Sequence, residues 1–166
     1  MKRFFFFSSF LFTTILGILP NQGWASGEPY RSCSNEDVIG AWTMPHQMIN
    51  SKIDTSDPFY FRYQRYVFEE DKTMKHLTSN QPITDKEREL QSKAPANRTY
   101  DVSNDGTLII KKKNSSDVEM MVCTYITGDQ PNAPVTAAHK GDIVLTFIVK
   151  PNEPPVLMRL LRREKD

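Results

Sequence analysis

The sequence predicts an all-β domain that forms an eight-stranded antiparallel up-and-down barrel. Two observations favour this class: short alternating or β-rich segments recur along the chain, and turn residues separate them as in a series of hairpins. A two-sheet sandwich of the same strands is the alternative that these patterns leave open. The predicted strands cover residues 40–47, 59–68, 73–78, 98–102, 107–112, 118–127, 143–150 and 156–162.

Residues 1–25 have the pattern of a secretory signal peptide. Two cations precede an apolar run over residues 4–19, and Gly23 and Ala25 supply the small residues of a cleavage site. The run is shorter than the ~20 apolar residues that span a bilayer, and an uncleaved anchor is the alternative. We therefore expect cleavage after Ala25, a periplasmic or secreted protein, and one domain over residues 26–166.

Charge and cysteine content restrict the function classes. The chain has 21 Lys and Arg against 20 Asp and Glu, so charge gives no case for binding nucleic acid. Cys33 and Cys123 are the two cysteines, and an even number in an oxidising compartment favours a disulfide between them. Two unpaired buried thiols are the alternative. Their wide spacing argues against a CxxC redox site or a Cys-only zinc site.

Two helical interruptions are expected between the strands. A helix-start signal at residues 34–37 is followed so soon by Gly40 that one turn of 3₁₀ helix is predicted. A capping box at residues 84–87 predicts a short, polar surface helix over residues 84–93, which Pro95 stops.

The connectors also carry information. Residues 69–73 and 103–107 predict tight hairpin turns, with Gly106 suited to positive φ. Residues 128–142 contain two prolines and two glycines and show no apolar period, so we expect a long loop at one rim of the barrel.

A helical turn leading into Gly40-Ala41-Trp42, a series of short hairpins and a last strand that carries an arginine, VLMRLLRR at 156–163, together resemble the lipocalin-like members of the calycin superfamily. The resemblance implies a barrel whose closed end holds the tryptophan, with an arginine of the final strand packed over its ring. Such a pair contributes ~0.5–2 kcal/mol. The corresponding barrel-floor residues are Gly40, Trp42 and Arg159, with Arg162 or Arg163 as substitutes for Arg159.

Strand alternation selects candidate ligand-facing residues. If Trp42 points inward, every second residue after it shares its face, unless a bulge near Pro45 turns the later residues outward. Thioether and imidazole groups suit copper, whereas plain packing is the competing interpretation. The candidates are Met44, His46 and Met48, together with Met74 and His76 in a later strand.

The aromatic segment FYFRYQRYVF at residues 59–68 is a second candidate for function. Both faces of such a strand carry aromatic side chains, so one face either packs under the 84–93 helix or contacts a partner. The candidate interface residues are Tyr60, Arg62 and Tyr66.

Recognised catalytic motifs are absent from the sequence, including the GxSxG elbow, the HExxH zinc motif and the GxxxxGK[ST] loop. We therefore expect a non-enzymatic protein without a cofactor, a nucleic-acid partner or a membrane span after cleavage, which binds a small apolar ligand in the barrel. One alternative is a protein-interaction module with a solid core, such as an inhibitor or an envelope assembly factor. Another is a copper-binding protein.

Overall fold

The structure, a computed structural model, describes residues 29–50, 52, 54, 56–129, 138–147 and 156–165. The predicted signal peptide therefore lies outside the described residues. The strands are β1 (Tyr30–Ser32), β2 (Gly40–Ile49), β3 (Tyr63–Phe68), β4 (Thr73–Ser79), β5 (Arg98–Val102), β6 (Thr107–Lys112), β7 (Val118–Ile126), β8 (Ile143–Phe147) and β9 (Leu157–Arg163).

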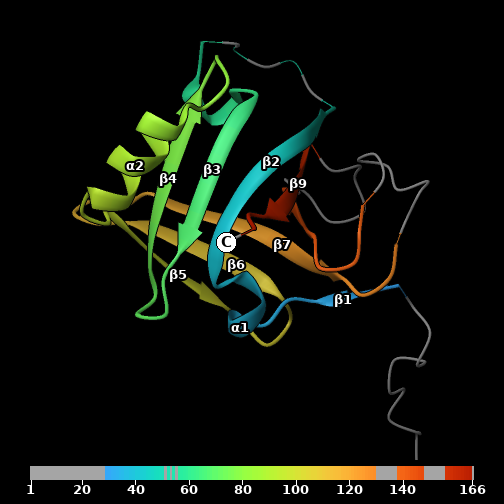
Figure 1. Ribbon diagram of the computed structural model, residues 1–166. Coiled ribbons are helices and arrows are strands. Elements are labelled where there is room, and N and C mark those ends of the chain that lie inside the picture. Colours follow the sequence, from blue (N-terminus) through green and yellow to red (C-terminus); the bar gives the residue numbers. More distant parts are fainter. Residues whose placement is uncertain are drawn as a thin grey trace, which may run out of the picture.

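These strands form a closed antiparallel barrel (Figure 1). The sheet order is β1-β7-β6-β5-β4-β3-β2-β9-β8, and β8 also pairs with β7, so that β2 to β9 make a complete ring. The short β1 pairs with β7 beyond the end of β6. The predicted all-β class and eight-stranded up-and-down barrel are confirmed, with strand ends close to those expected; predicted strand residues 148–150 lie outside the described part.

Three short helical segments interrupt the barrel. The N-terminal turn is a single α-helical turn in which Asp37 accepts a hydrogen bond from the Ser34 amide at 2.7 Å. The helix expected over residues 84–93 is present, and the capping box of Thr84 and Glu87 begins it. The segments are α1 (Asn35–Val38), the 3₁₀ turn η1 (Pro58–Tyr60) and α2 (Asp85–Lys93).

The predicted strand over residues 59–68 is wrong in its first part. Asp57 accepts a hydrogen bond from the Phe59 amide at 2.9 Å, and Pro58, which has no amide hydrogen, occupies the start of the turn. These two local effects produce η1 instead of an extended chain. Regular pairing begins only at Tyr63.

Large side chains fill the barrel interior. One of them is Arg159, which is fully buried. A smaller apolar cluster, centred on Leu160 and Val144, lies on the outer side of β8 and β9, because neighbouring strand residues point to opposite faces. The largest fully buried side chains are Trp42, Arg159, Tyr66, Phe68, Met74, Leu108, Ile110, Ile143, Leu145, Leu157, Leu160 and Leu161.

Helix α2 covers the outer face of β3 and β4 (Figure 1). Its Gln91 accepts a hydrogen bond from the Arg65 guanidinium at 2.6 Å. Arg65 and Arg88 both form ion pairs with Glu164, which follows β9. Helix α2 is thus fixed to the barrel and to the end of the last strand. Among the described residues, no helix is long and apolar enough to cross a membrane.

Candidate functional site

The closed end of the barrel is organised around Trp42, which is fully buried. Its indole Nε1 donates to the Val38 carbonyl at 2.7 Å, and the Arg163 guanidinium lies 4.5 Å from the ring centroid. The prediction that Arg159 covers this ring is wrong. In the strand register, Arg163 lies opposite Trp42, whereas Arg159 lies opposite Gln47 near the other end of β2.

Gly40 has a specific role at this end. Its φ is +122°, and a Cβ atom there would lie 3.0 Å from Arg163 Nη1. Arg163 also donates to the carbonyls of Ile39 and Asp37, at 2.7 and 2.9 Å. A glycine is therefore needed both for the backbone conformation and for the approach of the arginine.

The disulfide predicted between Cys33 and Cys123 is confirmed. It joins the segment before α1 to β7, and both cysteines are buried. The Cys33 amide also donates to the Cys123 carbonyl at 3.0 Å. The closed end is consequently held by a covalent bond as well as by packing.

A bulge in β2 separates the candidate ligand-facing residues. The register against β9 shifts between Thr43 and His46, so Met44 points inward while Met48 packs with the outer apolar cluster. The expectation that Met44, His46 and Met48 share one face is wrong for this reason. Within the described chain, no group of three His, Cys, Asp or Glu side chains is placed to hold a metal ion.

The other sequence-selected residues divide between the interior and the surface. Met74 is fully buried, and His76 stacks on Tyr66 with ring centroids 4.3 Å apart. Tyr66 is only 1% exposed, so its place in the predicted interface is wrong: β3 turns this ring into the barrel. Tyr60 lies in η1 and is partly exposed, and Arg62 follows η1 and is exposed.

A polar cluster occupies the interior near the end of the barrel opposite α1, which we call the mouth. The mouth cluster consists of Gln47, Gln64, Tyr66, His76 and Arg159. Arg159 Nη1 donates to the Tyr66 hydroxyl at 2.9 Å, and Tyr66 in turn donates to Gln64 Oε1 at 2.5 Å. His76 Nε2 lies 3.1 Å from the same oxygen of Gln64.

The mouth cluster holds a segment of main chain across the barrel end. We call this segment, residues 58–61, the mouth turn. Arg159 Nη2 donates to the Phe59 carbonyl, and the Arg159 guanidinium lies 4.2 Å from the Phe59 ring centroid. The same ring contacts Phe147 edge to face at 6.4 Å. Phe59 thus covers the guanidinium with its ring and binds it through its carbonyl.

Neutral donors bind the remaining carbonyls of the mouth turn. Gln64 Nε2 donates to the carbonyls of Phe59 and Phe61, both at 2.9 Å. Gln47 Nε2 donates to the Tyr60 carbonyl at 2.9 Å. Three consecutive carbonyls are therefore bound by inward-facing side chains, much as a barrel would bind a polar ligand.

Arg159 carries the uncompensated charge of this cluster. Within the described residues it forms no ion pair with a carboxylate, although it is 0% exposed. Burial raises the pKa of Tyr66, which keeps the phenol neutral. Burial, followed by the charges of Arg159 and Arg98, holds the pKa of His76 well below its ordinary value, so the imidazole is neutral too.

The ion pair between Arg98 and Glu119 does not change this balance. Arg98 and Glu119 pair with each other, so they add no net charge to the interior. Arg159 Nε and Gln47 Oε1 are buried without a hydrogen-bond partner in the described chain. A buried cation with an unused donor is unfavourable by several kcal/mol in general, and such groups concentrate at functional sites.

Sequence reasoning named Tyr66, His76 and Arg159 for other roles and did not find the mouth cluster. Gln47 and Gln64 carried no signal of their own, because isolated glutamines in strands are ordinary. The cluster depends on the register of β2 against β9 and of β3 against β4. The alternation of side chains along a β-strand is the one sequence pattern that places Gln64 and Tyr66 on the same face.

Comparison with protein-family models, with curated proteins and with solved structures finds no match for this chain.

Proposed function

We propose that this chain is an exported, lipocalin-like protein that binds a small apolar acid at the mouth of its barrel and catalyses no reaction. The observation that carries the proposal is Arg159, a fully buried guanidinium with no carboxylate partner and an unpaired Nε within the described chain. The Gly40-Ala41-Trp42 segment at the closed end of an eight-stranded barrel supports lipocalin-like membership. The disulfide is typical of an oxidising compartment.

The donor geometry of Arg159 favours a carboxylate over the present acceptor. A carboxylate can bind Nε and Nη2 of one guanidinium together, whereas the single Phe59 carbonyl accepts from Nη2 alone. The charged acid would also neutralise the buried cation. In this proposal the acid replaces the Phe59 carbonyl, and its apolar part takes the place of the Phe59 ring beside Phe147.

A pair of matched ligands tests the proposal. Dodecanoate and dodecanol have the same chain and differ in the charged head, and each can be titrated against protein loaded with an anilinonaphthalene sulfonate probe. We expect dodecanoate to bind about 10-fold to 100-fold more tightly than dodecanol, as for a hydrogen-bonded charge pair. Arg159→Gln should remove this preference, and Arg62→Gln, which changes an exposed arginine near the mouth, should preserve it.

Two results would contradict the proposal. One is equal affinity for the acid and the alcohol in the wild-type protein. The other is a preference for the acid that survives in a folded Arg159→Gln variant. Circular dichroism and thermal melting of each variant separate loss of the site from loss of the fold.

A second candidate function is a protein-interaction module with a filled barrel. It is favoured by a stripe on the outer face of β7, where Val118, Met120 and Val122 are 51%, 54% and 42% exposed. Three large apolar side chains in a row on one face are a common feature of contact surfaces. Affinity capture from the native host with wild-type protein and with Met120→Ser plus Val122→Ser tests it, since a specific partner should be lost only from the variant.

A further inference from the structure

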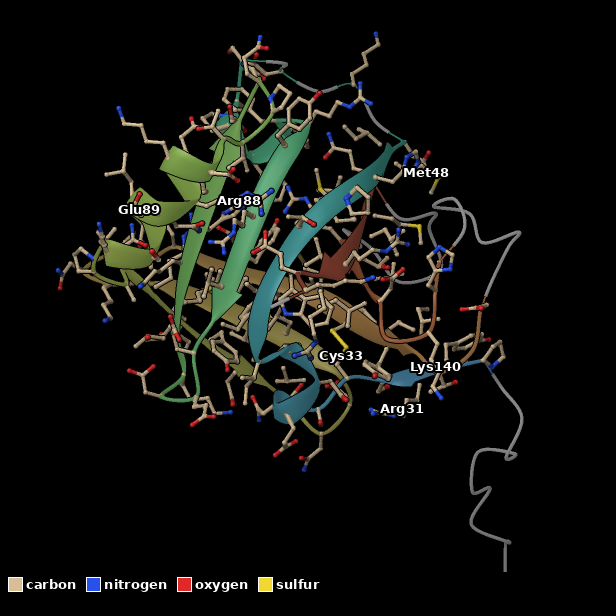
Figure 2. The ribbon with its side chains drawn as sticks, viewed as in Figure 1. Arg31, Cys33, Met48, Arg88, Glu89 and Lys140 are labelled. Atoms are coloured by element: carbon tan, nitrogen blue, oxygen red, sulfur yellow. A yellow bond between two sulfur atoms is a disulfide. The ribbon has the colours of Figure 1, made fainter. Side chains whose placement is uncertain are left out.

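An open pocket at the closed end of the barrel has a volume of about 500 Å³. Residues 139–142 form one side, and Tyr125 of β7 contributes an aromatic wall. The other side is formed at and just after the end of β9 by Arg162, Arg163 and Lys165. Lys140, labelled in Figure 2, belongs to the first side. We call this cavity the basic pocket, and the inference drawn from it is independent of the function proposed for the mouth.

Cations dominate the lining of the basic pocket. Lys140, Arg162, Arg163 and Lys165 contribute four positive charges, and Asp142 contributes one negative charge, which leaves 4 − 1 = +3 with neutral histidine. Asp142 is already bound to Arg162 at 2.8 Å. Among the described residues, neither lysine ammonium forms an ion pair. The formal charge of the whole chain is only +1, so this concentration of charge is local.

At the end of β9, the acidic residue Glu164 lies on a different side from the cations of the basic pocket. Glu164 turns to the opposite side and pairs with Arg65 and Arg88 under α2. Arg163 donates hydrogen bonds to main-chain carbonyls. Because carbonyls are neutral, they leave its positive charge uncompensated. The alternation at residues 163–165 therefore places two cations at the pocket and the carboxylate away from it.

The opposite side of the pocket is held in place by hydrogen bonds. Asp142 is 3% exposed and accepts from the His139 amide at 2.8 Å, and Asp129 accepts from the Lys140 amide at 2.8 Å. Gly141 has φ of +94°, and no atom lies within 4 Å of the position that a Cβ would occupy. The loop is thus built before any ligand binds, and the main chain at Gly141 is open to close approach.

We propose that the basic pocket binds a phosphate group carried by an organic molecule. A phosphate has up to two negative charges and several acceptor oxygens, which suit the guanidinium and ammonium groups that line the two sides of the pocket. The pocket is also wide enough for an attached group that packs against Tyr125, whose ring already lies 4.5 Å from the Arg31 guanidinium. A soluble phosphate ester and a phospholipid headgroup share this chemistry.

Two probes separate these sources. Calorimetry with inorganic pyrophosphate tests the soluble form, and co-sedimentation with vesicles of phosphatidylglycerol in phosphatidylcholine tests the headgroup, both at physiological ionic strength. The pocket variant is Lys140→Gln with Lys165→Gln, which removes two exposed ammonium groups. The matched control is Lys111→Gln with Lys112→Gln, an equal change of charge on the exposed end of β6.

We expect the pocket variant to bind at least one probe roughly tenfold more weakly than the wild type, and the control variant to differ by less than about twofold. Loss confined to pyrophosphate identifies a soluble phosphate, and loss confined to vesicles identifies a headgroup. The proposal is overturned if the wild type binds neither probe. It is also overturned if the two double variants lose affinity equally, because general charge attraction then explains the binding.

Discussion

The two ends of the barrel use arginine from the same strand in opposite ways. At the closed end, Arg163 covers the Trp42 ring and donates to two carbonyls, next to a disulfide and a bonded indole nitrogen. At the mouth, Arg159 is more deeply buried, yet it has only neutral acceptors and leaves Nε unpaired in the described chain. The two arginines lie four positions apart in β9, and in the described chain both donate only to neutral acceptors, but Arg163 is exposed to solvent whereas Arg159 is fully buried.

This contrast teaches where stability and function reside in the fold. The groups around Trp42 satisfy one another, so substitutions among them should mainly lower the free energy of unfolding. Groups at the mouth retain unused hydrogen-bonding capacity and an unneutralised charge, which stability alone does not explain. Substitutions at the mouth should mainly change ligand binding or the response to pH.

The largest expected effect is at Trp42. Trp42→Ala leaves a void that the surrounding strands cannot close, and should lower the free energy of unfolding by ~3–5 kcal/mol, measured by urea denaturation. Arg163→Ala should lower it less. Their double variant should lose less than the sum of the two, because both single changes remove the same contact. Additive losses would show that the two side chains do not stabilise each other.

Removal of the disulfide should follow in size. Cys33→Ser with Cys123→Ser opens a bridge between residues 90 positions apart in the chain. The expected loss in the free energy of unfolding is ~2–5 kcal/mol, typical of native bridges. The variant should also unfold at a lower urea concentration than the wild-type protein. Adding a reductant to the wild-type protein should lower its urea midpoint by the same amount. An unchanged midpoint under reducing conditions would contradict the importance of this bond.

Glu164 tests the attachment of α2 to the barrel. Glu164→Gln leaves Arg65, which is 8% exposed, without its charged partner, and should lower the free energy of unfolding by ~1–3 kcal/mol. The matched control is Glu89→Gln, at a residue labelled in Figure 2. This change removes an exposed pair with Lys93 on the same helix and should change stability by less than ~0.5 kcal/mol. Similar losses in both variants would contradict the special role of Glu164.

The same carboxylate predicts a dependence on pH. Burial acts to raise the pKa of Glu164, but the hydrogen bonds and charges of Arg65 and Arg88 outweigh it, and the pKa lies below its ordinary value. Its stabilisation is therefore complete above the ordinary value of about 4.3 and is lost as the pH falls through the lowered pKa. Unfolding curves of the wild type and Glu164→Gln should converge in this acidic range.

The smallest expected effect concerns His76 at the mouth. Its pKa is depressed in the folded protein, mainly by burial, so the unfolded chain takes up a proton first as the pH falls below about 6.5. Stability should then decrease with falling pH, by at most ~1.4 kcal/mol per pH unit from this group. His76→Gln should flatten the wild-type slope in this range. An identical slope in the variant would show that other groups cause the pH response.

The closed end was largely predictable because its signals are local. The turn before Gly40, the tryptophan two residues later and the hairpin residues at 69–73 and 103–107 each specify structure through their nearest neighbours. The disulfide needed only a count of cysteines and a compartment. The choice of arginine failed because it depends on the long-range register of β2 against β9, which places Arg163 and not Arg159 opposite Trp42.

The mouth was not predictable for the same physical reason. Phe59 and Tyr60 have the composition of a strand, yet the local cap at Asp57 and the rigid Pro58 place them in η1. The Phe59 carbonyl of that turn accepts a hydrogen bond from Arg159 of β9, 100 residues later in the chain. Neither segment has a sequence pattern that predicts this contact. It forms because strand pairing closes the barrel and brings the two segments together.

The most direct test of the central claim is the pKa of a bound acid. Dodecanoate labelled with carbon-13 at its carboxyl group can be titrated by NMR while bound to the wild-type protein and to Arg159→Gln. If the carboxylate of dodecanoate binds Arg159, the guanidinium should hold the pKa of the bound carboxyl below its value in water. The Arg159→Gln variant should lose this lowering of the pKa. A bound carboxyl whose pKa is raised in the wild type, as burial without a cation causes, would contradict the account.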